Sequence, residues 1–312
     1  MRVLGIDTSN YTTSAAVFDG AEGENTGRLL EVRPGELGLR QSDALFQHVK
    51  QLPGCFAQLH QAGWLDGLAA VGASTRPRAV EDSYMPCFLA GVNAAASFAL
   101  ARGIPLAATT HQQGHIAAAL FAAGGAELFG METLVFHVSG GTTDLLLCGG
   151  TESILPLGTS SDLYAGQAVD RRGVALGYPF PAGSYVSEQA ALCSERVRPK
   201  ATVRGMDCSL SGLENRCNRL LEQGKDVPHV CKYCLLCVAE TLTRMAQAAL
   251  REHPGLPVVF AGGVMSSDLI RTYVTHRVSG ARFVPGKFAS DNAIGAAILA
   301  AREIKAWPIS SM

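Results

Sequence analysis

Charged residues are scarce in this sequence, long hydrophobic runs are missing, and neither sign of charge is in excess. Only 17% of its 312 residues are charged and 47% are hydrophobic, whereas charged residues make up about 25% of an average soluble domain. That composition excludes intrinsic disorder. No apolar stretch reaches the ~18 residues of a membrane-spanning helix, so we expect no membrane partner. A formal net charge of −1 argues against a broad basic surface for nucleic acid and leaves room for a local patch.

The chain also lacks the features of an export signal. It opens on the strand-like run Arg2–Ile6, without a positively charged region followed by an apolar one. Its nine cysteines, an odd number, are typical of reduced thiols in a cytosol. We therefore expect a cytoplasmic protein. A length of 312 residues suggests about two domains.

Apolar runs separated by polar turns predict an α/β pattern that occurs twice. In the first half we expect a three-stranded meander followed by helix, strand, helix and strand, at about Val3–Ile6, Ser14–Phe18, Leu29–Val32, 43–62, Leu68–Ala73, 87–101 and Pro105–Ala108. The pattern restarts with a strand at Thr133–Val138, a small polar turn at Ser139–Thr143 and a strand at Leu145–Cys148. Turns of small residues let backbone N–H groups approach an anion. The repeat suggests a duplicated core with one phosphate-facing turn per half; two unrelated tight turns are the alternative.

The rest of the second half is less regular. We expect an irregular stretch from 149 to 210, with helices near 209–222 and 229–252. Strands follow at Pro257–Phe260 and Arg282–Pro285, and a last helix at about 291–305. Its small residues predict close packing against another element.

Two histidines stand four positions apart in His111-Gln-Gln-Gly-His115. At this spacing they share one face of a helix, where both imidazoles can converge on a metal ion. A zinc protease would need Glu directly after the first histidine, and Gln112 excludes that class. An incidental pair is the alternative.

Three aspartates and a double glycine are further candidates. Asp291, near the start of the last helix, suits either a helix N-cap or the third ligand of a two-His, one-carboxylate metal site. Asp162 and Asp170 flank Gly166 and could accept hydrogen bonds from ribose hydroxyls or simply solvate a loop. Gly262-Gly263, between a strand and a helix, would let a flat ring approach the backbone.

For a run of three cysteines and for a basic segment, a structural interpretation is favoured over a binding site. Cys231, Cys234 and Cys237 could supply three of the four ligands of an iron–sulfur cluster, but no fourth cysteine has a matching spacing. Small buried side chains of a core helix are favoured for them. The segment Glu195–Arg204 carries four basic residues, and a solvated loop is favoured there.

Taken in order along the chain, these motifs resemble the TsaD family of tRNA N6-adenosine threonylcarbamoyltransferases. The matching segments are Val3–Ser9, His111–His115, Val138–Thr143, Gly158–Asp170, Ser209–Leu213, Gly262–Val264 and Asp291-Asn292. The resemblance covers essentially the whole chain. It implies a two-domain α/β fold of the actin-like ATPase type, as in actin, sugar kinases and Hsp70. The first domain would span 1–107, with the helix of about 292–306 packing back on it, and the second 108–291.

The resemblance also implies a site and a reaction. One divalent or ferric ion, iron or zinc, would be held by His111, His115 and Asp291. An adenine nucleotide, threonylcarbamoyl-AMP or ATP, would bind with its phosphate at the turns Thr8–Asn10 and Ser139–Thr143. The implied nucleotide-binding residues are Ser139, Gly140, Gly141, Thr142, Thr143, Asp162, Gly166, Asp170, Gly183, Gly263 and Ser267. The threonylcarbamoyl group would pass to N6 of the adenine next to a tRNA anticodon. The first domain would bind a TsaB-like partner or a second copy of the chain.

Several positions depart from the family pattern. The acidic pair after the first strand is Tyr11-Thr12 here, and other departures are Gln113, Thr142, Gln167, Arg171, Glu214 and Ser267. They indicate a diverged paralogue. The alternatives are therefore a non-catalytic scaffold that binds nucleotide and metal, or a carbamoyltransferase with another acceptor.

His137 is a possible fourth metal ligand. It directly precedes Val138-Ser139, where some family members place a tyrosine ligand, and imidazole suits the same metals. Strand alternation puts His137 on the face of Val135 and Ser139. The alternative is a hydrogen-bonded histidine that binds no metal.

Overall fold

The chain folds into two compact units. The computed structural model describes residues 1–9, 11–32, 39–80, 82–288 and 293–305. Unit 1 comprises Met1–Phe121, Gly125–Gly130 and Asp291–Met312, and unit 2 comprises Ala122–Gly124 and Met131–Ser290. We expected the second domain to begin at residue 108. The helix that carries His111 and His115 instead belongs to unit 1 as far as Phe121, where it contacts Asp7 and Gly295 of that unit.

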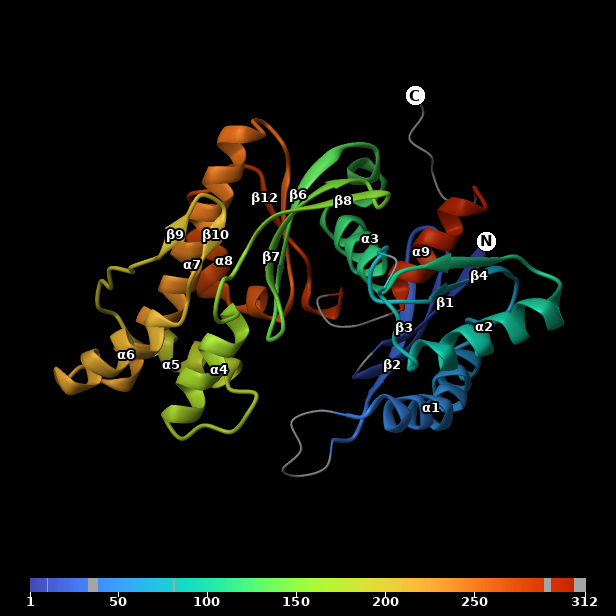
Figure 1. Cartoon of the computed structure of the whole chain (residues 1–312), viewed down its shortest axis with the longest axis horizontal. Coiled ribbons are helices and arrows are strands. Elements are labelled where there is room, and N and C mark those ends of the chain that lie inside the picture. Colours follow the sequence, from blue (N-terminus) through green and yellow to red (C-terminus); the bar gives the residue numbers. More distant parts are fainter. Residues whose placement is uncertain (10, 33–38, 81, 289–292, 306–312) are drawn as a thin grey trace. The chain divides into compact units, whose positions relative to one another are not determined.

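Unit 1 is built on a five-stranded sheet with the strand order β3-β2-β1-β4-β5 (Figure 1). The strands are β1 (Arg2–Ser9), β2 (Thr12–Phe18), β3 (Gly23–Leu29), β4 (Leu68–Ser74) and β5 (Leu106–Thr109). The first three are antiparallel, whereas β4 and β5 run parallel to β1. The expected third strand at Leu29–Val32 is wrong. The strand β3 was not expected because its sequence is polar. It begins after a turn in which the carboxylate of Asp19 accepts the backbone N–H groups of Ala21 and Glu22.

Helices cover both faces of this sheet. Leu4 and Ile6 of β1 pack in one core with α1 (Gln41–Gln61) and α2 (Phe88–Arg102). Gly5 faces the other way, and a Cβ there would lie 2.2 Å from the carbonyl oxygen of Ala293, just before α9 (Ile294–Glu303). The last helix therefore packs backbone to backbone on the sheet, as its small residues predicted. The remaining elements of this unit are α3 (His111–Gly124) and the short η1 (Gly125–Gly130).

Unit 2 repeats the same sheet. Its strand order is β12-β11-β6-β7-β8, formed by β6 (Glu132–Val138), β7 (Thr143–Gly149), β8 (Ser153–Thr159), β11 (Val258–Ala261) and β12 (Ala281–Phe283). The first three again form an antiparallel meander, and β11 and β12 again run parallel to its first strand. The two sheets correspond strand for strand, which confirms the duplicated core.

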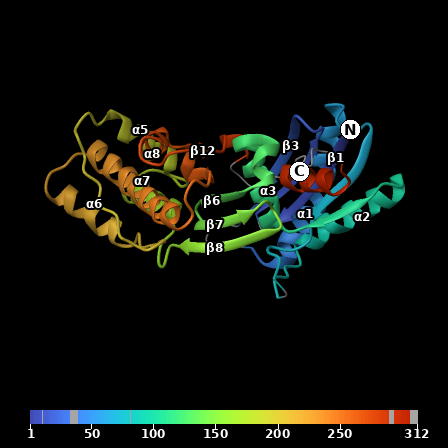
Figure 2. The same ribbon diagram turned by 90° about the horizontal axis from the view of Figure 1, so that it is seen from above.

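The helices of unit 2 form one apolar core with its sheet. They are α4 (Ala165–Ala175), α5 (Gly183–Leu192), α6 (Gly212–Glu222), α7 (Val227–Glu252) and α8 (Asp268–Thr275), with the short η2 (Gly263–Ser266), η3 (Gly286–Phe288) and the hairpin β9 (Val203–Arg204)–β10 (Asp207–Cys208). Figure 2 shows α7 as the long central helix, with α5, α6 and α8 beside it. The stretch 149–210 is more regular than expected, since it contains β8, α4 and α5. Among the described residues, no helix is long and apolar enough to cross a membrane.

Candidate functional site

The two histidines predicted to bind metal lie on the first turn of α3. Thr110 caps this helix: its hydroxyl accepts the backbone N–H of Gln113, while the Gln113 side chain accepts the N–H of Thr110. The cap fixes the turn that presents His111 and His115. Their Nε2 atoms lie 2.9 Å apart, so both imidazoles converge on one point, as the spacing predicted.

Asp7, two residues before the end of β1, orients this pair. Its Oδ2 lies 2.9 Å from Nδ1 of His111, and its Oδ1 accepts the backbone N–H of Ser9 at 2.9 Å. Burial by itself raises the pKa of Asp7, but the charge and hydrogen bond of His111 outweigh it and hold that pKa well below the usual range. The carboxylate keeps a proton on Nδ1 of His111 and thereby leaves Nε2 as the acceptor or ligand atom. This role of Asp7 was not expected from the sequence; the signal for it is an acidic residue directly after the buried apolar run Val3–Ile6.

The donor set of the pair suits a metal ion. Nitrogens 2.9 Å apart can both reach one ion at roughly 2.0–2.1 Å, and a carboxylate behind a ligating histidine is the usual second layer of such sites. Asp291, the predicted third ligand, lies outside the described residues. Within the described part of the chain, no group of three or more His, Cys, Asp or Glu side chains could hold a metal ion. The three-ligand set therefore stays a prediction.

The predicted nucleotide residues gather around a pocket in unit 2. The pocket has a volume of about 590 Å³. Its polar lining includes predicted residues from four segments of the chain, namely Ser139, Gly140, Gly166, Asp170, Gly183, Gly263 and Ser267. Apolar side chains from three helical segments, Val169, Leu235 and Val264, complete one part of the wall. Such a mixed, preformed cavity has the size and character of a small-molecule site.

Hydrogen bonds brace the turn between β6 and β7 on which this pocket rests. The Ser139 hydroxyl accepts the backbone N–H groups of Gly141 and Thr142 at 3.1 and 3.2 Å. The Thr143 hydroxyl accepts the N–H of Ala165 at 2.8 Å and thereby docks the first residue of α4 on the turn. The N-terminus of a helix and a turn of small residues are both suited to bind phosphate.

Two glycines allow close backbone approach at this turn. A Cβ on Gly166 would lie 2.6 Å from the Gly140 nitrogen. Gly262 has a φ of 102°, and a Cβ there would lie 2.2 Å from the carbonyl oxygen of Val138. Larger residues at either position would push α4 or η2 away from the turn.

Asp170 and Ser267 are the polar side chains of the pocket with the clearest binding potential. Asp170 Oδ1 accepts the backbone N–H of Ala182 at 2.8 Å, which orients its carboxylate beside Gly183. Ser267 is buried, and its hydroxyl has no hydrogen-bond partner among the residues that the structure describes. A buried hydroxyl without a partner is costly, and a bound ligand would satisfy it.

Asp162 does not line this pocket. Its carboxylate accepts five hydrogen bonds from the loop before α6 and from Leu163: the hydroxyls of Ser209 and Ser211 at 2.6 Å, and the backbone N–H groups of Leu163, Leu210 and Ser211. Burial raises its pKa, yet these bonds outweigh that effect and hold the pKa well below the usual range. In this geometry Asp162 anchors a loop.

The remaining candidates have mixed outcomes. Gly141, Thr142 and Thr143 belong to the braced turn but do not line the pocket. His137, on β6, lies between the buried Phe136 and Val138 and is itself half-buried; its role as a ligand stays a prediction. The cysteines of the three-cysteine run are all buried in α7.

Comparison with known sequences identifies similar proteins. The TsaD family, tRNA N6-adenosine threonylcarbamoyltransferase, matches residues 84–298. A tRNA N6-adenosine threonylcarbamoyltransferase of Anaeromyxobacter sp. is 32% identical over 291 residues, covering 89% of this chain and 85% of the relative. One of Pyrobaculum aerophilum is 30% identical over 301 residues, covering 94% of this chain and 84% of the relative.

Solved structures share the fold at low identity. Component A of the Acidaminococcus fermentans (R)-2-hydroxyglutaryl-CoA dehydratase aligns with a TM-score of 0.58 and 16% identity, over 98% of this chain and 99% of that one. Full-length HypF aligns with a TM-score of 0.60 and 12% identity, over 98% of this chain and 47% of that one. These likenesses show a two-domain fold of the actin-like ATPase type. Together with the sequence matches over most of its length, they show that the chain belongs to the TsaD family.

Proposed function

We propose that this chain transfers a threonylcarbamoyl group from threonylcarbamoyl-AMP to N6 of the adenine next to a tRNA anticodon, with the help of a bound metal. The observation that carries the proposal is the convergence of His111 and His115 behind the buried carboxylate of Asp7. A structural histidine pair has no need of a buried carboxylate that fixes its tautomer. In a member of this family, the arrangement favours a retained metal site.

His111, His115 and Asp291 would hold the ion, and imidazole nitrogens with one carboxylate suit iron or zinc. Asp291 lies three positions before α9. Gly295 of that helix packs against Gly114, between the two histidines, so closely that a Cβ on it would lie 1.8 Å from the Gly114 oxygen. When bound, the ion would polarise the carbonyl of the transferred group as a Lewis acid. The hydrogen bond to Asp7 keeps the proton of His111 on Nδ1, so that the lone pair of Nε2 is available to the ion.

The pocket of unit 2 would bind the adenylate. Val169, Leu235 and Val264 offer an apolar wall for the adenine ring, and Asp170 can accept hydrogen bonds from ribose hydroxyls. The braced turn would place the backbone N–H of Gly140 at the phosphate, since the N–H groups of Ser139, Gly141 and Thr142 donate within the turn. The Ser267 hydroxyl would gain the partner that it lacks among the described residues.

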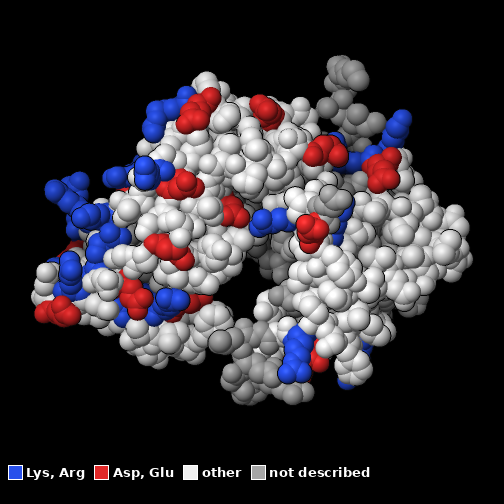
Figure 3. Space-filling model, in the orientation of Figure 1, with Lys and Arg blue, Asp and Glu red and all other residues white. Residues whose placement is uncertain are grey.

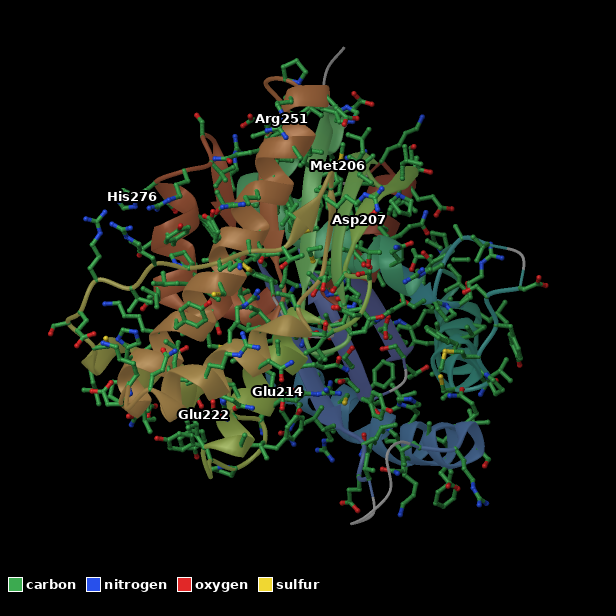
Figure 4. All side chains as sticks on the ribbon, turned by 60° about the vertical axis from the view of Figure 1, so that its left-hand side comes forward. Met206, Asp207, Glu214, Glu222, Arg251 and His276 are labelled. Atoms are coloured by element: carbon green, nitrogen blue, oxygen red, sulfur yellow. The ribbon has the colours of Figure 1, made fainter. Side chains whose placement is uncertain are left out.

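A local basic surface on unit 2 is available for tRNA. Arg196, Arg198, Lys200 and Arg204 are all exposed. A groove of about 280 Å³ beside the β9–β10 hairpin is lined by Arg244 and Arg251 of α7. Figure 3 shows basic side chains gathered over the part of unit 2 that holds α6 and α7, with acidic ones between them, and Figure 4 shows Arg251 near Met206 of the hairpin. Clustered arginines bind the phosphate backbone of RNA.

A partner protein would bind unit 1. Phe46 and Val49 on α1 are 64% and 56% exposed, and Leu29 at the end of β3 is 75% exposed. These apolar side chains, from α1 and the adjoining edge strand, suit a TsaB-like partner or a second copy of the chain.

The departures from the family pattern favour a second candidate, a nucleotide-binding scaffold without transfer activity. Tyr11 and Thr12 stand where the family pattern has an acidic pair, and Ser267 stands where it has asparagine. A scaffold would keep the pocket and the fold and need no acidic side chains near the transferred group.

Mass spectrometry of tRNA nucleosides separates the two candidates. The chain would be expressed in a bacterium whose own transferase of this family is depleted, beside a double His111→Ala, His115→Ala variant. Threonylcarbamoyladenosine that is restored by the wild-type chain and lost with the variant would support the transferase. If a known transferase of this family restores the nucleoside under the same conditions and this chain does not, the result contradicts the transferase and supports the nucleotide-binding scaffold.

A further inference from the structure

One loop of unit 1 is tied at both of its ends to the turn that carries the two histidines. This β4–α2 loop spans residues 75–87. The first N–H groups of a helix have no partner inside it, and those of His111 and Gln112 donate to carbonyl oxygens at the start of the loop, at 2.9 and 3.0 Å. At the other end, the ring of Phe88 packs edge-on against the ring of His111, with 6.3 Å between the centroids. The loop therefore lies beside the candidate metal site.

The β4–α2 loop carries two arginines whose side chains are available to a ligand. Arg76 and Arg78 are both exposed, and neither belongs to an ion pair in the described part of the chain, although Asp82 of the same loop is exposed too. They are the only Lys or Arg residues from 51 to 101. The acceptor of the His111 N–H is the carbonyl oxygen of Arg76, so the backbone that carries the first arginine is fixed at the site. Two unpaired cations there favour an anionic ligand.

The same loop presents an exposed aromatic ring. The hydroxyl of Ser83 accepts the backbone N–H of Arg78 at 3.0 Å, and the N–H of Ser83 donates to the carbonyl oxygen of Val80 at 3.2 Å. These bonds fold the loop back on itself and bring the backbone of Tyr84 close to that of Arg78. The side chain of Tyr84 is 63% exposed. Surfaces that bind single-stranded RNA combine these two groups, cations for the phosphates and aromatic rings for the unpaired bases.

We propose that the β4–α2 loop binds the RNA acceptor next to the adenine that is modified. Arg76 and Arg78 bind phosphates of the RNA backbone, and Tyr84 stacks on a neighbouring unpaired base. The proposal rests on the proposed function in one respect, that the acceptor is an RNA. The guanidinium group suits phosphate because it donates two parallel hydrogen bonds, and the bases of an anticodon loop are free to stack. Since the loop is held beside His111, these contacts position the acceptor at the metal site.

The salt dependence of RNA binding tests the two arginines. The affinity for a fluorescently labelled anticodon stem-loop RNA is measured by anisotropy. Two phosphate contacts to a single strand add about 1.4 to the slope of log affinity against log salt, so between about 50 and 200 mM salt the wild type should lose roughly sevenfold more affinity than Arg76→Gln, Arg78→Gln. The variant Arg76→Lys, Arg78→Lys should keep most of the slope, because lysine also binds phosphate. The control Lys50→Gln, Arg102→Gln removes two exposed charges elsewhere on unit 1 and should keep the wild-type slope.

The stacking role of Tyr84 has a different signature. Tyr84→Ala should weaken RNA binding at least about fivefold and leave the salt slope unchanged, since the ring carries no charge. Tyr84→Phe keeps the ring and should bind as the wild type does. Phe46→Ala is the matched control, because Phe46 on α1 is 64% exposed; it should leave the affinity unchanged.

The outcomes separate this proposal from the transferase. If the wild type and the glutamine variant have equal salt slopes, or if the control variant loses as much slope as the glutamine variant, the role of the loop is overturned. A wild-type chain that does not bind the RNA overturns it as well. The nucleoside measurement decides the transferase independently, since a chain that binds RNA through this loop and transfers nothing would contradict the transferase alone. Circular dichroism of every variant establishes that a loss of binding is not a loss of fold.

Discussion

A Cβ on Gly295 would lie 1.8 Å from the carbonyl oxygen of Gly114, so α9 and α3 meet backbone to backbone. Gly114 lies between His111 and His115 on the first turns of α3. The contact therefore holds the histidine-bearing turn against the helix that follows Asp291. No side chain other than hydrogen fits at this crossing.

Gly295→Ala should destabilise unit 1. The added methyl must push two helix backbones apart, and overpacking of this kind costs about 1–3 kcal/mol, although alanine favours the helix itself. Thermal unfolding should show a lower Tm. Gly212→Ala is the matched control, because a Cβ there meets only the flexible end of Arg216, at 3.8 Å. An unchanged Tm for Gly295→Ala would mean that the helices are not packed this closely.

Removing either histidine should remove the metal and leave the fold intact. His111 and His115 are only half-buried, so His115→Ala creates no large cavity while it deletes one of two converging nitrogens. Metal content after dialysis against limiting zinc or iron should fall to background in both single variants, with an unchanged circular dichroism spectrum. His60→Ala, at an exposed position of α1, should retain the metal. Equal metal content in all three variants would eliminate this site.

Asp7→Asn tests the carboxylate behind the pair. An amide can still bond to His111 but supplies no negative charge, and changes in such supporting groups typically weaken metal binding by 10–100-fold. Competition with a metal chelator should reveal a loss of this size. If the affinity is unchanged, Asp7 does not support metal binding and its hydrogen bonds to Ser9 and His111 serve the fold alone.

Ser267→Asn should strengthen nucleotide binding. The longer side chain supplies an amide where the Ser267 hydroxyl has no partner among the described residues, and one added hydrogen bond contributes about 1 kcal/mol, or roughly a fivefold lower Kd. Calorimetry with AMP or ATP measures it. Ser187→Asn, which adds an amide elsewhere on the pocket lining, is the control; equal gains in both variants would argue against a specific role for position 267.

Local apolar patterning predicted the parts of the fold that carry the sites. The expected runs Val3–Ile6 and Thr133–Val138 lie in the central strands of the two sheets and are almost entirely buried, and a continuous apolar run before a turn of small residues has few other structures available. The helical spacing of His111 and His115 likewise fixed their convergence, since it depends only on neighbours along the chain.

Features that depend on distant pairing were missed. Strand β3 has the polar sequence Gly23–Leu29 and exists because it pairs with β2 along its whole length. Asp162 lies at a position where the family resemblance implies a contact with the nucleotide. Its carboxylate instead accepts hydrogen bonds from a loop 48 positions further along the chain. The hydrogen bond from Arg172 to Asn218 joins two helices of which only α6 was expected. Such contacts arise from tertiary packing, which overrides local pattern.

The buried side chain of His48 makes the stability of unit 1 depend on pH. It lies on α1 with no exposed surface, and its Nδ1 is 2.8 Å from the Thr13 hydroxyl. Burial lowers its pKa from 6.5 to about 4, although the nearby charge of Asp7 opposes the shift. The histidine is therefore neutral in the folded protein at neutral pH. Its protonation at low pH is opposed by burial, which disfavours the charged form.

The sign of the effect follows from proton uptake. Between about pH 6.5 and pH 4 the unfolded chain binds a proton at His48 that the folded chain does not, so the free energy of unfolding falls as the pH falls. A shift of this size corresponds to roughly 3 kcal/mol across the window. His48→Gln removes the titration, so its urea-unfolding free energy should vary less between pH 7 and pH 4 than that of the wild type. His60→Gln, at an exposed position, should keep the wild-type slope, and a His48→Gln slope equal to that of the wild type would show that His48 does not titrate as a buried neutral group.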